Sequence, residues 1–413
     1  MKGKYPFEYL KNPNIQKSVE EIWDDIDSYT GEFFEDDPVN LDRSDLFIPV
    51  PPLKYDGIFT KGILMTQCAD YILDKYPKIK ELFFVGAYTM WSSYSWCDRA
   101  DLYFSCYENK PREAYHKNKY NNKKDIIFIP LQDADFTDEN MMAPAYNTDK
   151  THDIICVATP YEVKNHFIIA KAIKIYEEKY GLKLKSKFIF GTKDAKKDRR
   201  KCYDFSQLSK ITKCIIAEVN HILDNKMTDY IEIYPFVPVL EMPKHYSSAK
   251  CCVLASLIEG KNRAITEAMA CGTPVVLFKQ HNQWARGKYP IFPQGSGELA
   301  EEFTPEALAD AIHKVINNPQ NYNARRNYLK YNGRTNFVNT CINYIPYYKK
   351  IIPELEYGRF HDNIWVNLAT QDNYQMCFHS FLYQKQHNLN WVQKLENIDF
   401  LIKYYYSLFG IKE

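Results

Sequence analysis

The chain has little glycine and no excess of either charge. Its 15 glycines among 413 residues are about half the usual share, so each one needs a positional reason. The 53 lysines and arginines balance 52 acidic residues, and the net charge of +1 argues against a dedicated nucleic-acid-binding protein. Long apolar runs are also missing: the best one, residues 251–258, is far shorter than the roughly 18 residues of a membrane span.

The cysteines and the first residues lack familiar patterns as well. Eleven cysteines, an odd number with no C-x-x-C pair, indicate reduced thiols rather than a disulfide framework or a zinc site. The start, MKGKYPFEYLKNPNIQ, has no apolar segment typical of a secretion signal. A hydrophobic content of 45% is ample for folded cores. We therefore expect a folded cytoplasmic protein that needs no structural metal.

Charge is distributed unevenly along the chain. Residues 1–45 carry an excess of acids, and residues 164–201 carry an excess of bases that ends in the run KDAKKDRRK at 193–201. Solvated surface is the simplest interpretation of both segments. The alternative is that the basic segment 193–201 contacts an anionic membrane surface or phosphate, which would make the protein membrane-associated.

Short apolar runs rich in β-branched and aromatic residues predict strands, and amphipathic stretches between them predict helices. The strands are expected at residues 46–50, 82–86, 102–106, 126–130, 153–158, 187–190, 230–234, 251–255 and 274–278. The helices are expected at residues 62–76, 164–180, 207–223, 241–248, 263–270 and 304–317, and mainly helices follow residue 320. This alternation predicts an α/β fold with parallel sheets.

The same alternation suggests how the chain is divided. The polar stretch AYNTDKTHD, near residues 145–153, is a plausible linker between two α/β halves. We expect a reduced or divergent Rossmann-like domain at residues 1–150 and a clearer one at residues 151–340. A helical segment at residues 341–413 is expected to pack back on the first domain.

The segment that carries the chemistry is SLIEGKNRAITEAMACGTPVV, residues 256–276. Glu259 ends a predicted strand, where ligands bind in open α/β sheets. Gly260 lets a ligand approach the backbone, and Asn262 is a suitable N-cap for the helix at residues 263–270. Free N–H groups at such a helix start form an anion site suited to a diphosphate.

Other residues of the segment support this interpretation. Lys261 and Arg263 add positive charge beside the helix start. Glu267 lies one turn into the helix, where its carboxylate could accept hydrogen bonds from a ribose diol. Gly272 is suited to end the helix before the next strand.

A glutamate, seven residues and a second glutamate, followed by AMACGTPVV, resemble the donor-site signature of retaining glycosyltransferases of the GT-B fold, family-4 type. The resemblance covers roughly residues 150–320. It implies two Rossmann-like domains facing a cleft and a nucleotide-diphosphate sugar as donor. It also implies a glycan, lipid-linked or protein-linked acceptor, as in polysaccharide biosynthesis, with no cofactor and no metal strictly required.

The resemblance also assigns residues to roles. The stretches DIICVATPYEVKN and KFIFG match the family's strand–loop pattern, and residues 236–238 would hold the nucleobase. The catalytic residues implied are Glu259, Lys164 and Arg263. The donor-binding residues implied are Gly260, Lys261, Asn262, Glu267, Asn165, Gly191 and Val237.

The sequence departs from the family pattern at three places. An arginine that usually follows the first strand of the second half is replaced by Ala158-Thr159-Pro160, so Arg263 would compensate. The usual aromatic–glycine pair after Glu-Gly is replaced by Lys261-Asn262. The first half lacks the glycine-rich loop after its first strand. A catalytically inactive protein that binds a nucleotide sugar or a partner is therefore the alternative.

Three further patterns have simpler interpretations. Asp133-Ala134-Asp135 fits a metal–nucleotide motif of another glycosyltransferase fold, but a polar turn after a strand explains it better. The glycines at 295 and 297 resemble a dinucleotide fingerprint, but no strand precedes them and we interpret residues 295–300 as a loop. The aromatic residues of the stretch at 85–96 could stack on sugars, although core packing is the commoner role. An epimerase on the same fold lacks any clear acid–base set here.

Overall fold

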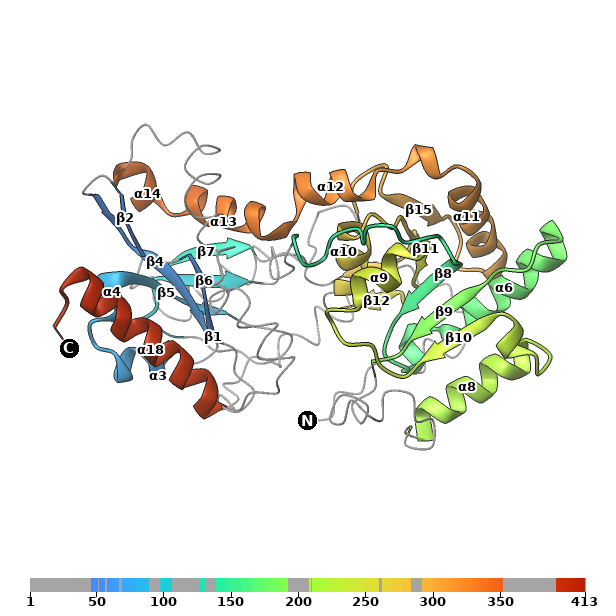
Figure 1. The fold of residues 1–413 in the computed structure, drawn as a ribbon, viewed down its shortest axis with the longest axis horizontal. Coiled ribbons are helices and arrows are strands. Elements are labelled where there is room, and N and C mark those ends of the chain that lie inside the picture. Colours follow the sequence, from blue (N-terminus) through green and yellow to red (C-terminus); the bar gives the residue numbers. More distant parts are fainter. Residues whose placement is uncertain are drawn as a thin grey trace. The chain divides into compact units, whose positions relative to one another are not determined.

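The computed structural model forms two compact units (Figure 1). It describes residues 46–50, 52–55, 58–66, 69–88, 97, 99–105, 126–130, 139–191, 208, 210–259, 262–283, 292–351 and 391–412. The described residues between 139 and 331 form one unit, which we call the central unit. Those at 46–130 and 332–412 form the other, which we call the flanking unit.

The unit boundaries lie near residues 139 and 331, whereas the sequence suggests boundaries at 150 and 340. The Arg325 side chain explains part of the difference, since its guanidinium donates hydrogen bonds to the carbonyls of Glu139 and Met142 at 2.7 and 2.9 Å. It also donates to the carbonyl of Ala270 at 2.7 Å. Residues 139–150 are thereby attached to the central unit.

The central unit is built on a six-stranded, wholly parallel sheet (Figure 1). From edge to edge the strands follow the order β10-β9-β8-β11-β13-β15. Their bounds are β8 His152–Val157, β9 Ser186–Ile189, β10 Ile231–Tyr234, β11 Ala249–Val253, β13 Val275–Phe278 and β15 Gly297–Ala300. In chain order this is the 3-2-1-4-5-6 arrangement of a doubly wound sheet, whose switch point lies between the first and fourth strands, here β8 and β11.

Two groups of helices pack on this sheet. One comprises α6 (His166–Tyr180), α8 (Lys210–Ile222) and α11 (Pro305–Asn317), and α11 also contacts β11, β13 and β15. The other comprises α9 (Met242–Ser247), α10 (Arg263–Ala270) and α12 (Ala324–Tyr331). The α11 helix begins as its sequence predicts, because the Thr304 hydroxyl accepts a hydrogen bond from the Ala307 N–H and Pro305 fills the first helical position.

The flanking unit has a five-stranded sheet in the order β1-β4-β5-β6-β7. The β1–β4 pair is antiparallel and the other pairs are parallel. The bounds are β1 Leu46–Val50, β4 Gly62–Thr66, β5 Phe83–Tyr88, β6 Leu102–Ser105 and β7 Ile127–Pro130. A short antiparallel pair, β2 (Leu53–Tyr55) and β3 (Ile58–Thr60), precedes β4. Both sheets confirm the expected α/β class with parallel strands.

Helices from the end of the chain complete the flanking unit. The C-terminal helix α18 (Trp391–Phe409) places Ile402 and Tyr405 in one core with α3 (Ala69–Lys75), α4 (Ile79–Leu82) and the buried Phe83. Because side chains alternate along a strand, Phe84 points the other way, toward Tyr347 of α14 (Pro346–Ile351). The remaining helix, α13 (Gly333–Tyr344), contacts β6 through Phe337 and Phe104.

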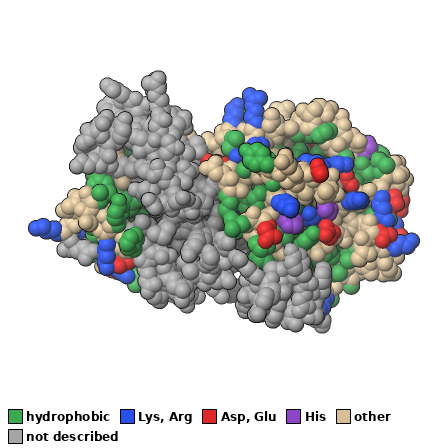
Figure 2. Space-filling view, viewed as in Figure 1, with side chains coloured by type: hydrophobic (Ala, Val, Ile, Leu, Met, Phe, Trp, Pro, Cys, Tyr) green, Lys and Arg blue, Asp and Glu red, His purple; other side chains and the backbone are tan. Residues whose placement is uncertain are grey.

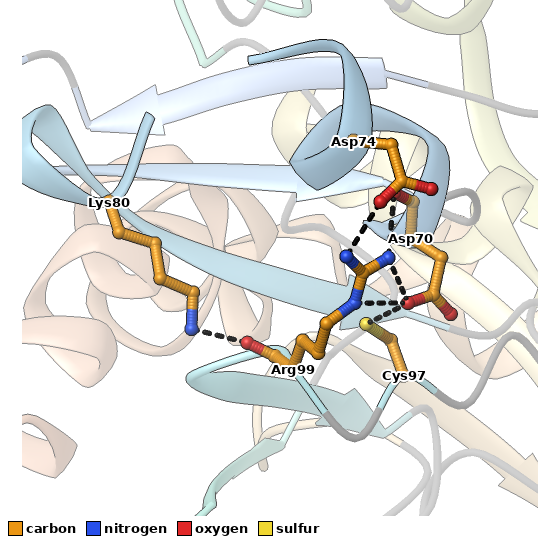
Figure 3. Close-up of polar contacts among 5 residues, drawn as sticks. All are labelled: Asp70, Asp74, Lys80, Cys97 and Arg99. Carbon is orange, nitrogen blue, oxygen red and sulfur yellow. Dashed lines mark hydrogen bonds and ion pairs between the residues drawn. The ribbon is translucent and has the colours of Figure 1, made fainter. Parts of the chain in front are cut away.

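A polar contact ties the segment before β6 to α3 (Figure 3). The Arg99 guanidinium contacts Asp70 at 2.8 Å and Asp74 at 2.6 Å, and the Cys97 thiol donates to the same Asp70 oxygen. Lys80 binds the Arg99 carbonyl. Since Arg99, Asp70 and Asp74 are all about half exposed or more, this cluster orients a connection rather than adding much stability.

Two secondary-structure predictions were wrong. Residues 62–66 form strand β4 rather than the start of a helix, because this run lies between β1 and β5 and is buried on both faces. An apolar run buried on both faces has no period that separates a strand from a helix. Residues 297–300 form strand β15 rather than a loop, since they pair in parallel with β13.

Gly297 shows why that strand is hard to recognise in the sequence. A Cβ atom on Gly297 would lie 1.8 Å from the Val275 carbonyl oxygen, so only glycine permits this pairing. Gly297 therefore marks close strand packing, Gly295 takes a left-handed turn before it, and the two do not form a dinucleotide fingerprint. Among the described helices, none is both long enough and apolar enough to cross a membrane.

Candidate functional site

The candidate site lies at the carboxyl ends of β8 and β11, on either side of the switch point. After β8 the chain makes a short 3₁₀ turn, Glu162–Lys164, and enters α6 at His166. After β11 it passes through the short strand β12 (Ile258–Glu259), which pairs with β14 (Asn282–Gln283), and enters α10 at Arg263. Each connection thus ends in a helix N-terminus on the edge of the sheet where such folds bind ligands.

Lys164 and Glu259, predicted from separate segments of the sequence, form an ion pair. The Lys164 Nζ lies 2.5 Å from both carboxylate oxygens of Glu259. The side chains are 18% and 4% exposed, so the pair is largely withdrawn from water. Burying two charges is costly and rarely increases stability over apolar packing, which makes such a pair at a sheet edge more informative about function than about folding.

Asn262 joins the same cluster and starts α10. Its amide nitrogen donates to Glu259 Oε1 at 3.1 Å, and its carbonyl oxygen accepts from the Ala264 N–H at 3.0 Å. The extended backbone of Asn262, with φ −97° and ψ 101°, is typical of an N-cap. The predicted cap is confirmed, and one side chain therefore links the helix start to the glutamate.

Asn165 connects the two sides of the switch point. Its backbone is left-handed, with φ 51°, which asparagine tolerates better than other residues with a Cβ. Its buried side-chain amide donates to the carbonyl of Ala255 at 3.0 Å, just after β11. The loop carrying Lys164 is thereby held against the segment that leads to Glu259.

Glu267 and Arg263 form a second polar pair along α10. Their closest approach, Arg263 Nη2 to Glu267 Oε1, is 3.6 Å, and the side chains are 28% and 13% exposed. The other Glu267 oxygen accepts a hydrogen bond from the buried Tyr246 hydroxyl at 3.1 Å. The sequence predicts Arg263 beside a phosphate, whereas in the structure it lies beside the glutamate assigned to the ribose.

His166 begins α6 directly after this cluster. Its ring is buried and lies edge-on to Phe190 at 5.3 Å between ring centroids. Burial lowers the pKa of His166 to about 4, so the ring is neutral near pH 7. Nearby, His281 Nδ1 lies 2.7 Å from the carbonyl oxygen of Ser256, which fixes the turn before Glu259.

The remaining predicted site residues are only partly placed. Gly191 follows β9 and has a left-handed φ of 60°, and Val237 is buried after β10. Gly260 and Lys261 lie outside the described residues, as do the acidic motif at 133–135, the basic segment 193–201 and the aromatic residues 89–96.

Sequence reasoning missed one residue of the site, Tyr246, and one contact, from the Asn165 amide to Ala255. Tyr246 supports Glu267 from a different helix, and the Asn165 amide bridges to Ala255. Nothing in the local sequence HYSSAKCC, residues 245–252, indicates the role of Tyr246. Its contact with Glu267 depends on how α9 packs against α10. Within the described residues, no group of three or more histidines, cysteines and carboxylates is arranged to hold a metal ion.

The amino ends of the same strands carry a different set of charges. Figure 2 shows basic and histidine side chains among carboxylates on the surface over α9. His152 lies 3.0 Å from Glu232, while Lys187 is buried and donates to the Ser248 hydroxyl at 3.3 Å. Burial and the nearby Lys187 lower the pKa of His245 to about 4. These residues lie at or near the amino ends of β8, β9, β10 and β11.

A doubly wound parallel sheet, with a buried ion pair and a capped helix start at its switch point, defines a Rossmann-like ligand-binding unit. Residues 151–318, less than half of the chain but nearly all of this unit, match the family model described as Glycosyl transferases group 1. No curated protein matches the sequence.

Several solved structures align with part of the chain. Sucrose-phosphate synthase from Thermosynechococcus elongatus aligns with 16% identity and a TM-score of 0.42, covering 62% of this chain and 60% of its own. A glycosyltransferase from Rickettsia africae ESF-5 aligns with 14% identity and a TM-score of 0.46, covering 69% and 80%. The C-terminal domain of a glycosyl transferase group 1 family protein from Francisella tularensis has 20% identity and a TM-score of 0.35, covering 47% and 95%. With every TM-score below 0.5, we infer function from the matched segment and the site's own side chains.

Proposed function

We propose that this protein is a glycosyltransferase that takes a sugar from a nucleotide-diphosphate sugar and transfers it to a glycan, lipid-linked or protein-linked acceptor with retention of configuration. One observation carries the proposal: Lys164, Glu259 and Asn262 meet at the switch point of the unit that matches the glycosyltransferase model. A cation, a carboxylate and a helix N-terminus are the groups needed to hold a diphosphate beside sugar hydroxyls.

In this mechanism the protein stabilises negative charge that develops on the leaving diphosphate. Lys164 and the N–H groups at the start of α10 supply positive charge, and Arg263 adds to it from the first turn. Glu259 binds sugar hydroxyls and orients the anomeric carbon. Glu267 binds the ribose, and the base rests near Val237. No enzyme nucleophile takes part, and the positive charge comes from side chains and N–H groups rather than from a metal.

The ion pair between Lys164 and Glu259 then describes the site before donor binding. Both Glu259 oxygens contact the Lys164 ammonium, and one of them also accepts from Asn262. A diphosphate that attracts Lys164 weakens its hold on the carboxylate, which then becomes available to sugar hydroxyls. Donor binding and exposure of Glu259 are coupled in this way.

The test is turnover of a panel of UDP-, GDP- and ADP-sugars, with hydrolysis and transfer to simple glycosides measured for wild type and Glu259→Ala. We expect one donor to be consumed by the wild type and the variant to lose most of that activity while keeping its affinity for the nucleotide. Failure of every nucleotide sugar to bind would refute the proposal. A product with inverted configuration would refute retention alone.

The alternative is an inactive protein that binds a nucleotide sugar or a partner. It is favoured by Ala158-Thr159-Pro160, which stand where the family usually has an arginine near the diphosphate. Tight binding without any turnover across the panel would support it. In either case, we place the protein in the cytoplasm, with peripheral membrane contact through residues 193–201.

A further inference from the structure

The second glutamate of the site is held by a buried tyrosine from another helix. Tyr246, in the last turn of α9, is fully buried and donates its hydroxyl hydrogen to Glu267 Oε2 at 3.1 Å. The Glu267 side chain is 13% exposed, so its carboxylate lies between this buried donor and the surface. The other oxygen, Oε1, has Arg263 at 3.6 Å, which is too long for a strong hydrogen bond.

The position of Tyr246 is itself fixed by the segment that follows α10. The buried Thr273 hydroxyl donates to the Tyr246 carbonyl at 2.7 Å. Thr273 follows Gly272, whose left-handed φ of 76° ends α10 and turns the chain toward β13. The segment that ends α10 therefore holds Tyr246 in place, and Tyr246 in turn contacts Glu267 in the middle of α10.

The chemistry of this contact suits a fixed donor rather than a titrating group. Burial and the nearby Glu267 charge raise the pKa of Tyr246 well above its ordinary value, so the hydroxyl keeps its proton. A neutral hydroxyl can satisfy one carboxylate oxygen without cancelling its charge. Glu267 then keeps its other acceptor sites, oriented for neighbouring hydroxyls of a ligand.

We propose that Tyr246 is a positioning residue, which orients the Glu267 carboxylate so that it accepts hydrogen bonds from both ribose hydroxyls of the donor nucleotide. This inference rests on the proposed function, since it requires a nucleotide at the site. Tyr246 acts through Glu267 alone and touches no ligand. Its hydroxyl should therefore matter for a nucleotide with a ribose diol and not for one without.

The experiment measures the dissociation constants of UDP, GDP and ADP and of their 2′,3′-dideoxy forms by calorimetry. For the best-binding base, we expect wild type to prefer the ribose form by roughly tenfold, as for one or two hydrogen bonds to a charged group. Tyr246→Phe should reduce this preference to about threefold or less by weakening only the ribose form. Tyr176→Phe is the matched control, because Tyr176 is a buried tyrosine in the last turns of α6 whose hydroxyl contacts His313.

The outcomes separate this inference from the proposed function. If the wild type binds none of the nucleotides, the proposed function fails and this inference fails with it. If wild type binds both forms equally, or Tyr246→Phe weakens both equally, the positioning role is refuted while nucleotide binding stands. Should Tyr246→Phe not fold, Glu267→Asp draws the carboxylate back from the hydroxyl, and full retention of the ribose preference in that variant overturns the role.

Discussion

The carboxyl ends and the amino ends of the six parallel strands, called here the carboxyl edge and the amino edge of the sheet, carry similar kinds of residues in different settings. At the carboxyl edge, Lys164 and Glu259 form a buried pair beside a capped helix start. At the amino edge, Lys187 is more deeply buried than Lys164 but contacts a hydroxyl, and Glu232 is half exposed beside His152. Charge or burial alone does not distinguish the edges. The difference lies in the surroundings of the charges: among the described residues, the ion pair at the carboxyl edge lies beside helix N-termini.

The largest effect should come from exchanging one carboxylate on each edge. We expect Glu259→Gln to lower kcat by roughly a hundredfold to a thousandfold, because the sugar is no longer oriented in the transition state. Glu232→Gln should leave kcat unchanged, since its carboxylate lies at the other edge. Steady-state kinetics with the donor found in the panel provide the measurement. Equal losses in both variants would show that the edges do not differ in function.

The next effect concerns one lysine at each edge, Lys164 and Lys187. Lys164→Met should weaken binding of a nucleoside diphosphate by roughly tenfold to a hundredfold, because a charged contact to phosphate is lost. It should also lower the stability by about 3–5 kcal/mol, since Glu259 is left buried without its partner. Adding Glu259→Gln should restore the stability but not the binding.

Lys187→Met is the matched control at the amino edge. Calorimetry should show an unchanged nucleotide affinity. Because burial already lowers the pKa of Lys187, its replacement by an apolar side chain should leave the melting temperature equal or higher. A loss of nucleotide affinity in Lys187→Met would contradict the assignment of the site to the carboxyl edge.

A smaller effect is expected at Gly297, the first residue of β15. Gly297→Ala should lower the free energy of unfolding by about 2–3 kcal/mol, because the new Cβ would collide with the Val275 carbonyl oxygen and force the strands apart. Gly181→Ala is the comparison, since Gly181 has a left-handed φ of 67° with open space around it. It should lose only about 1 kcal/mol, from backbone strain. Chemical denaturation measures both, and equal losses would contradict the collision.

The last effect is a change in pH dependence rather than in stability near neutral pH. The folded pKa of His166 is lowered to about 4, whereas the unfolded chain takes up the proton near pH 6.5. Stability from this residue is therefore complete above pH 6.5 and is lost as the pH falls toward 4. His166→Phe should make the fall shallower by about 1.4 kcal/mol per pH unit in that window. Unfolding measured from pH 7 to 4 tests this, and identical slopes would show that another histidine, such as His245, dominates.

Much of the central unit could be predicted from its sequence. The helix at 263–270 was predicted with its N-cap Asn262, because capping and glycine ends are local signals. The joining of Lys164 to Glu259 follows from the parallel order of strands, since the carboxyl ends of adjacent strands share one edge. Strand β15 could not be predicted, because the reason for Gly297 is the backbone of a strand elsewhere in the chain.

The flanking unit was harder for a related reason. Residues 62–66 are buried by strands on both sides, so their apolar run has no alternation.

In the central unit, the contact between Tyr246 and Glu267 depends on how α9 packs against α10 and on the Thr273 side chain, and no local pattern predicts such a contact. Features set by neighbouring residues, such as helix caps, could therefore be predicted from the sequence, whereas contacts set by packing could not.

The tether from Asn165 to Ala255 bears on how the proposed glycosyltransferase could change its donor during evolution. A glycine at this position would allow the same left-handed turn but has no side-chain amide to reach across the switch point. Because the tether fixes the span from Lys164 to Glu259, a bulkier sugar gains little room by moving that loop. Selection for a new donor would act instead on residues outside the tethered loop, such as those after β10.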